Sequence, residues 1–140
     1  MANALFDPGR EGFLDGTIDF DTAVIKVILG RGYTWDATDK FVSDLTSLTQ
    51  VAVSAALTSK TVTNGIADAA DITFSAVGAG AACDCLIIVQ ASAVGGGADV
   101  ADSAKRVIAY IDTGTGMPVT PNGGDITVAW DSATNKIFKL

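Results

Sequence analysis

Apolar and polar positions alternate every two residues in two stretches of the last third of the chain, residues 106–140. Because successive side chains of a β-strand point to opposite faces, this alternation predicts two strands. Asn122 and several glycines lie between them and provide the backbone angles that tight turns need. We therefore expect a β-meander, in which any strand between Pro118 and Pro121 is short and lies at an edge. The predicted faces are Val107, Ala109 and Ile111 against Ile108, Tyr110 and Asp112, then Ile126, Val128 and Trp130 against Thr127, Ala129 and Asp131.

Short segments rich in Val, Ile and Thr recur along the rest of the chain and predict further strands. Residues 21–29 are expected to be buried on both faces except at Lys26, and residues 83–91 to form a central strand. Asn64 and Gly65 form a dipeptide typical of β-hairpins. The remaining expected elements are strands over residues 49–55 and 71–77, a hairpin within 60–66, one helical turn within 41–48, a polar loop over 33–40 and a flexible exposed loop over 94–102. About eight strands at this spacing indicate a sandwich or jelly roll.

The N-terminal segment has a different pattern and predicts a short helix over residues 4–14. Asn3 would be its N-cap and Gly16 would lie beyond its end. Pro8 and Gly9 are expected to interrupt the helix, because neither residue favours a helix interior. Its large apolar side chains would form one stripe, made of Leu5, Phe6, Phe13 and Leu14.

These patterns together define the predicted architecture. The fold class is mainly β, a β-sandwich or jelly-roll-like single domain with a short N-terminal helix. We divide the chain into an N-terminal helical anchor segment, residues 1–16, and a single β-sandwich domain, residues 17–140. A length of 140 residues with 49% apolar and 18% charged side chains is typical of one folded domain rather than of a disordered chain.

The charge of the chain restricts its partners. The net charge is −7, with only nine Lys and Arg residues. Binding to nucleic acid or to anionic lipid depends on basic side chains, so we expect neither as a partner. Polar residues occupy the N-terminus where a secretory signal needs an apolar core, and the longest apolar run, residues 85–89, is far short of the roughly 20 residues of a membrane span. We expect a chain made in the cytoplasm that leaves it only within a larger particle.

Few residues offer catalytic chemistry. The sequence has no histidine, which removes the commonest general base and a common metal ligand. Asp19 and Asp21 are a candidate carboxylate pair on one strand face, although a solvated strand entrance explains them better. Cys83 and Cys85 would share a face of an extended segment, too far apart for an unstrained disulfide and too few for a zinc site. We expect free, half-buried thiols, no cofactor, no metal and no enzymatic activity.

Two further possibilities remain open. Acidic turns are candidate calcium ligands, but no stretch matches an EF-hand loop, and Asp favours turns in any case. Trp35 and Trp130 are candidates for a sugar-binding face, although packing is the default role of tryptophan without polar partners at a known spacing. The acidic turns are Asp36/Asp39, Asp68/Asp71 and Asp99/Asp102, together with Asp15 before Gly16.

Three segments carry a resemblance to a known family. They are MANALFDPGREGFLDGTIDFDTAVIKVIL, LTSKTVTNGIADAADITFSAV and VIAYIDTGTGMPVTPNGGDITVAWDSATNKIFKL. Together they resemble small virion proteins of tailed phages, which are similar to capsid decoration, or cement, proteins with β-sandwich folds. The similarity covers most of the chain and is most specific in the final third. Two regions depart from the family pattern: Pro8 and Gly9 interrupt a more helical segment, and residues 78–103 replace a more charged form.

The resemblance implies a protein that binds the outer capsid surface of the virion and stabilises the head. Its partners would be the major capsid protein and other copies of itself, with a trimer as the first expectation. Binding to assembled shell but not to free subunits stabilises the shell by RT ln(1 + [L]/Kd), about 2.7 kcal/mol at a roughly hundredfold excess over Kd. The expected capsid or protomer contacts are Leu5, Phe6, Phe13 and Leu14. The alternative, that the helix only caps the sandwich, stays open.

Other functions compete with this expectation. The chain would also suit another virion component, such as a head fibre, a tail protein or a receptor-binding module, and the copy number per particle separates these from a decoration protein. A glycan-binding β-sandwich that uses Trp35 and Trp130 is an alternative of a different class. A small enzyme is the weakest alternative, because the sequence contains no recognisable catalytic pair.

Overall fold

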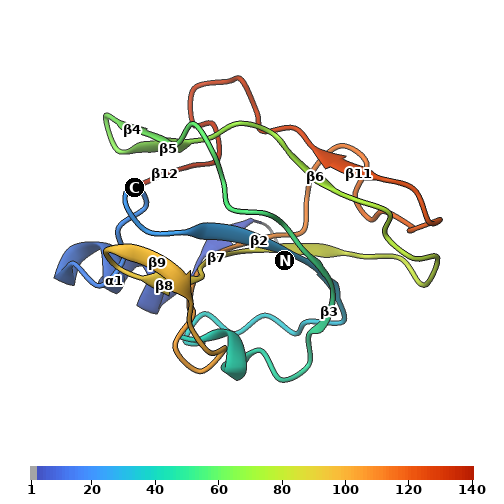
Figure 1. The fold of residues 1–140 in the computed structure, drawn as a ribbon, viewed down its shortest axis with the longest axis horizontal. Coiled ribbons are helices and arrows are strands. Elements are labelled where there is room, and N and C mark those ends of the chain that lie inside the picture. The colour runs from blue at the N-terminus through green and yellow to red at the C-terminus, as the bar shows by residue number, and fades with distance from the viewer. Residues whose placement is uncertain (1–2) are drawn as a thin grey trace.

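One five-stranded sheet lies in the middle of the molecule (Figure 1). The computed structural model describes residues 3–140. The strand order is β1-β10-β7-β2-β3, and each neighbouring pair is antiparallel. These strands are β1 (Ala4–Leu5), β2 (Ile25–Arg31), β3 (Thr49–Val53), β7 (Cys85–Gln90) and β10 (Arg106–Ile111).

Both faces of the central sheet are buried, because its middle strands are apolar on both sides. In β2, Val27 and Leu29 face one hydrophobic cluster and Ile28 faces the other. In β7, Ile88 belongs to the first cluster and Ile87 to the second. This confirms the predicted central strand and the burial of the second predicted strand from Ile25 onward, with Lys26 partly buried as the exception. Asp21 and Thr22, which were predicted to belong to that strand, are exposed and precede it.

Small sheets cover the first face. They lie above the central sheet in Figure 1 and pack against it through the first cluster. One has the order β12-β5-β4 and the other pairs β11 with β6. Their strands are β4 (Thr61–Thr63), β5 (Ile66–Asp68), β6 (Ile72–Phe74), β11 (Ile126–Val128) and β12 (Phe138–Lys139). The molecule is therefore a mainly β, sandwich-like single domain with one short helix, as predicted.

An irregular segment, residues 33–48, covers the second face and lies below the sheet in Figure 1. It contains one 3-10 turn, η1 (Val42–Asp44), which confirms the single helical turn predicted there. Val42 and Leu45 project from this turn into the second cluster. The spacing of these two side chains explains why a turn of helix, rather than a strand, covers this face.

The helix α1 (Asp7–Asp15) begins later than predicted, because Ala4 and Leu5 form β1 instead. Pro8 does not interrupt the helix, since it lies in the first turn, where a missing backbone N–H costs little. Gly9 does not interrupt it either. A Cβ at Gly9 would lie 2.9 Å from the carbonyl oxygen of Ile108, so the glycine allows α1 to pack directly on the backbone of β10.

Both ends of the predicted helix can be compared with the structure. Gly16 ends the helix in the left-handed conformation, with φ 80°, as predicted. Asn3 is not the N-cap. Its side chain instead accepts hydrogen bonds from the backbone N–H groups of Asp112 and Thr113 at 3.0 Å, because the intervening residues form a strand beside β10. Residues 1–16 thus include a strand of the central sheet, and the division at residue 16 stays a prediction.

The predicted meander in residues 106–140 is wrong, because β10 and β11 lie in different sheets. The chain between them leaves the central sheet and crosses to the covering layer. Val119 forms an isolated bridge with Cys83 on the way, so pairing between the two prolines is short. Ile126, Val128 and Trp130 do pack together against the first cluster, as the alternation predicted.

A β-bulge also changes the predicted faces of β10. The register against β7 shifts between Val107 and Ala109. A bulge adds one residue to a strand and reverses the direction of the side chains beyond it. Val107 therefore faces the second cluster and Ala109 the first, although strict alternation predicted one face for both.

Residues 94–102, predicted to be a flexible loop, belong largely to a hairpin. It joins β8 (Ser92–Ala93) to β9 (Gly96–Asp99). Gly96 and Gly97 adopt φ angles of 91° and 100°, which other residues rarely adopt. The carboxylate of Asp99 lies 2.8 Å from the ammonium of Lys26, and this ion pair ties the hairpin to the central sheet. The Asn64–Gly65 hairpin is confirmed, with both residues at positive φ between β4 and β5.

Candidate interaction surface

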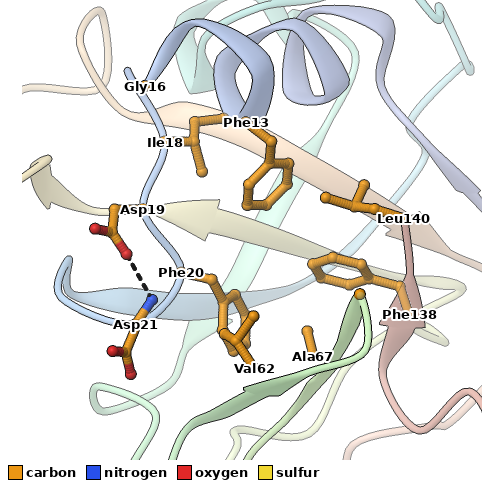
Figure 2. Close-up of a pocket in the computed structure, with 11 residues that line it drawn as sticks. Phe13, Gly16, Ile18, Asp19, Phe20, Asp21, Val62, Ala67, Phe138 and Leu140 are labelled. Atoms are coloured by element: carbon orange, nitrogen blue, oxygen red, sulfur yellow. Dashed lines mark hydrogen bonds between the residues drawn. The ribbon is translucent and has the colours of Figure 1, made fainter.

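An open apolar groove of about 490 Å³ lies where α1, the following turn and the β12-β5-β4 sheet meet. Figure 2 shows aromatic rings around this space, with aliphatic side chains at its edge. Phe138 is the central ring of the aromatic group, since the ring centroids of Phe13 and Phe20 lie 5.9 and 5.7 Å from its own. The groove is lined by Phe13, Gly16, Ile18, Asp19, Phe20, Asp21, Val62, Gly65, Ala67, Phe138 and Leu140.

Backbone pairing holds the far side of the groove in place. Phe138 of β12 lies opposite Ala67 of β5, and the N–H of Leu140 donates to the carbonyl oxygen of Gly65 at 2.9 Å. The hairpin turn therefore fixes the position of the last strand. Leu140 and Val62 remain 56% and 55% exposed at the edge of the groove, so the groove presents apolar surface to solvent.

Asp19 lines one edge of the groove, and Asp15 precedes Gly16, another lining residue. Asp15 accepts hydrogen bonds from the N–H and hydroxyl of Thr17 at 2.9 and 2.6 Å. Asp19 accepts from the N–H groups of Asp21 and Thr22 at 2.9 and 3.1 Å. These bonds lower the pKa of Asp15 and of Asp19, with the Thr17 and Thr22 contacts as the leading causes. Both carboxylates therefore stay ionised at neutral pH.

The same hydrogen bonds show how Asp19 and Asp21, the candidate carboxylate pair, are arranged. Asp19 and Asp21 lie in a turn before β2 rather than on a strand face, and the hydrogen bond between them runs from backbone to side chain (Figure 2). Their side chains point away from the three aromatic rings. The preferred interpretation, a solvated strand entrance, matches this geometry.

The four predicted contact residues do not lie on one surface. Leu5 is buried in the first cluster and Phe6 in the second, so the fold itself covers them. Phe13 is partly buried and lines the groove. Leu14 is 88% exposed on the outer side of α1. Of the four, only Phe13, in the groove, and Leu14, on the outer side of α1, are accessible from outside the fold.

Several residues of this surface could not be identified from the sequence. Phe20, Phe138 and Leu140 come from distant parts of the chain, and no local pattern connects them. The sequence does distinguish Val62, because it is an apolar residue between two threonines in a predicted hairpin. A single exposed valine is ordinary by itself, so only its place at the edge of the groove connects Val62 with this surface.

A second, polar recess of about 300 Å³ lies beside residues 33–47. Its carboxylates already have partners within the protein. The Tyr33 hydroxyl donates to Asp39 at 2.8 Å, and Asp44 accepts from the backbone N–H groups of Lys40 and Phe41 at 3.1 and 2.8 Å. Burial raises the pKa of Asp39. No group of three or more potential metal ligands occurs among residues 3–140.

The two cysteines differ from the prediction. Cys83 belongs to the first cluster and Cys85 to the second, so they do not share a face. Cys83 lies in an isolated bridge before β7 begins, which breaks the strict alternation. Both are free thiols and fully buried rather than half-buried. Burial raises the pKa of Cys83 and raises that of Cys85 to about 12, which disfavours the reactive thiolate.

Both tryptophans take part in packing. The ring of Trp35 lies 4.7 Å from Phe6 and 5.2 Å from Tyr110, between centroids. The indole N–H of Trp130 donates to the carbonyl oxygen of Ala70 at 3.1 Å. These contacts support the default packing role of the two residues.

Within the described part of the chain, no helix has the length and apolar character needed to cross a membrane. Comparison of the chain with models of known protein families and with curated proteins found no match. The resemblance to phage virion proteins therefore remains an expectation.

Proposed function

We propose that this protein is a non-enzymatic structural component of a tailed-phage virion, a decoration protein that binds the outer surface of the major capsid lattice and stabilises the head. The observation that carries the proposal is the open groove around Phe138, which leaves apolar surface uncovered on an otherwise well-packed domain. The sequence resemblance supplies the class of partner. Both point to a protein that acts by surface contact.

The remainder of the fold supports a passive, rigid role. The central sheet is buried on both faces, and its hairpins are tied by backbone pairing and ion pairs. The carboxylates of the polar recess are engaged in local hydrogen bonds. A rigid scaffold loses little conformational entropy on binding, which favours attachment through a small surface.

The decisive experiment is quantitative mass spectrometry of purified virions from the phage whose genome encodes the chain. We expect a copy number comparable to that of the major capsid protein. A few copies per particle would instead indicate the tail or a head fibre, and absence from virions would overturn the proposal. The genes beside the coding sequence offer a first check, because a neighbouring major capsid gene is expected.

A trimer remains our proposed arrangement on the capsid. A threefold cluster would place several copies of the same surface against symmetry-related subunits of the lattice. Cryo-electron microscopy of whole heads would test it, with density grouped in threes as the expected result. Isolated single copies on the lattice would overturn the trimer but leave decoration intact.

A further inference from the structure

We infer that the groove around Phe138, together with Leu14, receives a peptide segment of the partner protein in which large apolar side chains are flanked by Lys or Arg. The inference rests on the proposed function, since it describes the capsid segment that this surface recognises. It is carried by two independent properties of the surface, its uncovered apolar side chains and its acidic edge.

Exposed large apolar side chains gather around the groove. Val62 and Leu140 lie at its edge, and Leu14 follows Phe13, which lines it. The only other strongly exposed large apolar residues in the described chain are Val53 and Val94. An apolar patch surrounded by polar residues is the usual mark of a protein-binding surface.

The charges around this patch are mostly negative. On α1, Glu11 and Asp15 lie one turn apart and flank Leu14 on the exposed side of the helix. Asp19 and Asp21 continue the acidic edge along the groove. A partner with Lys or Arg beside its apolar residues is complementary to this arrangement, whereas an acidic partner is repelled.

Two basic residues, Lys60 and Lys139, lie near this surface. The ammonium of Lys60 donates to the carbonyl oxygen of Ala23 and is partly buried, which lowers its pKa. Lys139 lies in β12 beside the hairpin turn at Gly65. Lys60 interacts electrostatically with Asp21 and Asp19 and offsets part of their charge. The four acidic residues Glu11, Asp15, Asp19 and Asp21 outnumber these two lysines, so the edge keeps a net negative charge.

The same charges argue against other occupants. A second copy of the chain would bring an identical acidic edge, and the net charge of −7 on each copy adds to the repulsion. Anionic lipid and nucleic acid are repelled for the same reason. A basic, apolar peptide segment is therefore the occupant that fits both properties of the surface.

The test is an NMR titration of the isotope-labelled full chain with three synthetic peptides. The first peptide has a Leu-Phe-Ser-Leu centre flanked on both sides by Lys and Arg. The second replaces the basic residues by Glu, and the third replaces the apolar ones by Ser. We expect binding of the first peptide alone, with shifts confined to α1, the turn over residues 16–21, the β4-β5 hairpin and β12. Equal binding of the Glu peptide, or shifts elsewhere, would overturn the inference.

Variants separate the two properties. Leu14→Ser is expected to weaken binding of the basic peptide by about tenfold, as is Val62→Ser. The matched control is Val53→Ser, which removes a valine of similar exposure, 49%, from the edge strand β3 and should change nothing. Glu11→Gln combined with Asp21→Asn is expected to weaken binding by about threefold. Asp84→Asn is its control, because Asp84 is exposed beside the opposite end of β2.

A change of ionic strength tests the charge contribution without substitutions. Raising it from about 0.1 M to about 1 M shortens the screening length from about 10 Å to about 3 Å. Binding of the basic peptide should weaken, and the double variant, which removes two of the four acidic charges, should lose part of that salt dependence. A salt-independent affinity would overturn the electrostatic part of the inference.

Retention on phage heads distinguishes failure of the inference from failure of the proposed function. Heads made without the protein are incubated with the wild-type chain or with each variant. If the wild type does not bind heads, decoration is wrong, whatever the peptides do. If the wild type binds and Leu14→Ser and Val62→Ser bind equally well, decoration stands and the groove is not its contact. Self-association that Leu14→Ser abolishes would show a second copy as the occupant and would also overturn the inference.

Discussion

Two aromatic clusters lie on opposite faces of the same sheet and differ in what covers them. We call one of them closed because residues of the same chain cover it and leave it only the polar recess beside Tyr33 and Trp35, whereas the other, open cluster lines an apolar groove. The closed cluster consists of Phe6, Tyr33, Trp35 and Tyr110, and it is covered by residues 33–48. The open cluster consists of Phe13, Phe20 and Phe138, and it lines the groove. The two clusters have similar ring distances. They differ in whether a segment of the same chain covers them.

The two clusters also differ in the polar groups that their aromatic residues have. The closed cluster contains hydroxyl groups at its border, and the Tyr33 hydroxyl donates to Asp39 at 2.8 Å. The open cluster contains phenylalanines, which have no polar group to satisfy. A covered cluster with polar anchors stabilises the fold, whereas an uncovered one without them is suited to bind another apolar surface. Substitutions and a change of pH can test this distinction.

The greatest loss of stability is expected from removing an aromatic ring of the closed cluster. Phe6→Ala should lower the free energy of unfolding by about 3–5 kcal/mol, because the ring is fully buried and leaves a cavity. Phe138→Ala should cost clearly less, since that ring already faces an open groove. Urea unfolding of both variants measures the difference. Equal losses would mean that the two clusters contribute equally to the fold.

The next largest effect concerns the close contact between Gly9 of α1 and the backbone of β10. Gly9→Ala should destabilise the protein by about 1–3 kcal/mol, because its Cβ would lie 2.9 and 3.0 Å from backbone oxygens of β10. Gly95→Ala is the control, since nothing lies within 4 Å of a Cβ there. Thermal unfolding of the two variants checks this. A tolerated Gly9→Ala would show that α1 can move away from the sheet.

A pH effect is expected on the closed side. Burial raises the pKa of Cys85 from 9.0 to about 12. The unfolded thiol loses its proton at lower pH than the folded thiol, so its contribution to stability is complete below pH 9.0 and is lost as the pH rises to about 12. Stability curves of wild type and Cys85→Ala should converge over this range. A constant difference between the curves would contradict the burial of this thiol.

The weakest effect on stability is expected for the exposed residues beside the open cluster. Leu14→Ser and Val62→Ser should change the free energy of unfolding by less than about 0.5 kcal/mol, because both side chains are largely exposed. Their effect should appear in binding instead. Chemical denaturation beside the peptide titration measures both quantities. A large loss of stability in either variant would place that residue among those that maintain the fold.

Much of the secondary structure could be predicted from local sequence. The Asn64–Gly65 hairpin follows from the positive φ angles that these residues tolerate, and Gly16 ends α1 for the same reason. The apolar runs around β2 and β7 predict strands buried on both faces, as observed. Each of these signals acts over a few neighbouring residues, so it can be read without knowing the partner strand.

Long-range packing determines the features that local sequence could not predict, namely side-chain burial and the composition of the candidate surface. The bulge in β10 sends Val107 and Ala109 to different faces, and its position depends on pairing with β7. Leu5, Phe6, Phe13 and Leu14 looked equivalent in sequence, yet β10 and the closed cluster bury the first two and leave Leu14 exposed. The candidate surface joins residues from α1, β4 and β12, which no local pattern relates.

Local patterns in the amino-acid sequence specify a β-rich, hairpin-rich domain with two doubly buried strands and a short N-terminal helix. The packing of distant segments selects which apolar side chains the chain covers with its own residues and which it leaves exposed. The physical reason is that side-chain alternation and turn chemistry are local properties, whereas burial depends on which distant segment packs over a face. Residues 33–48 cover one cluster of this protein, and no segment among residues 3–140 fills the groove beside the other.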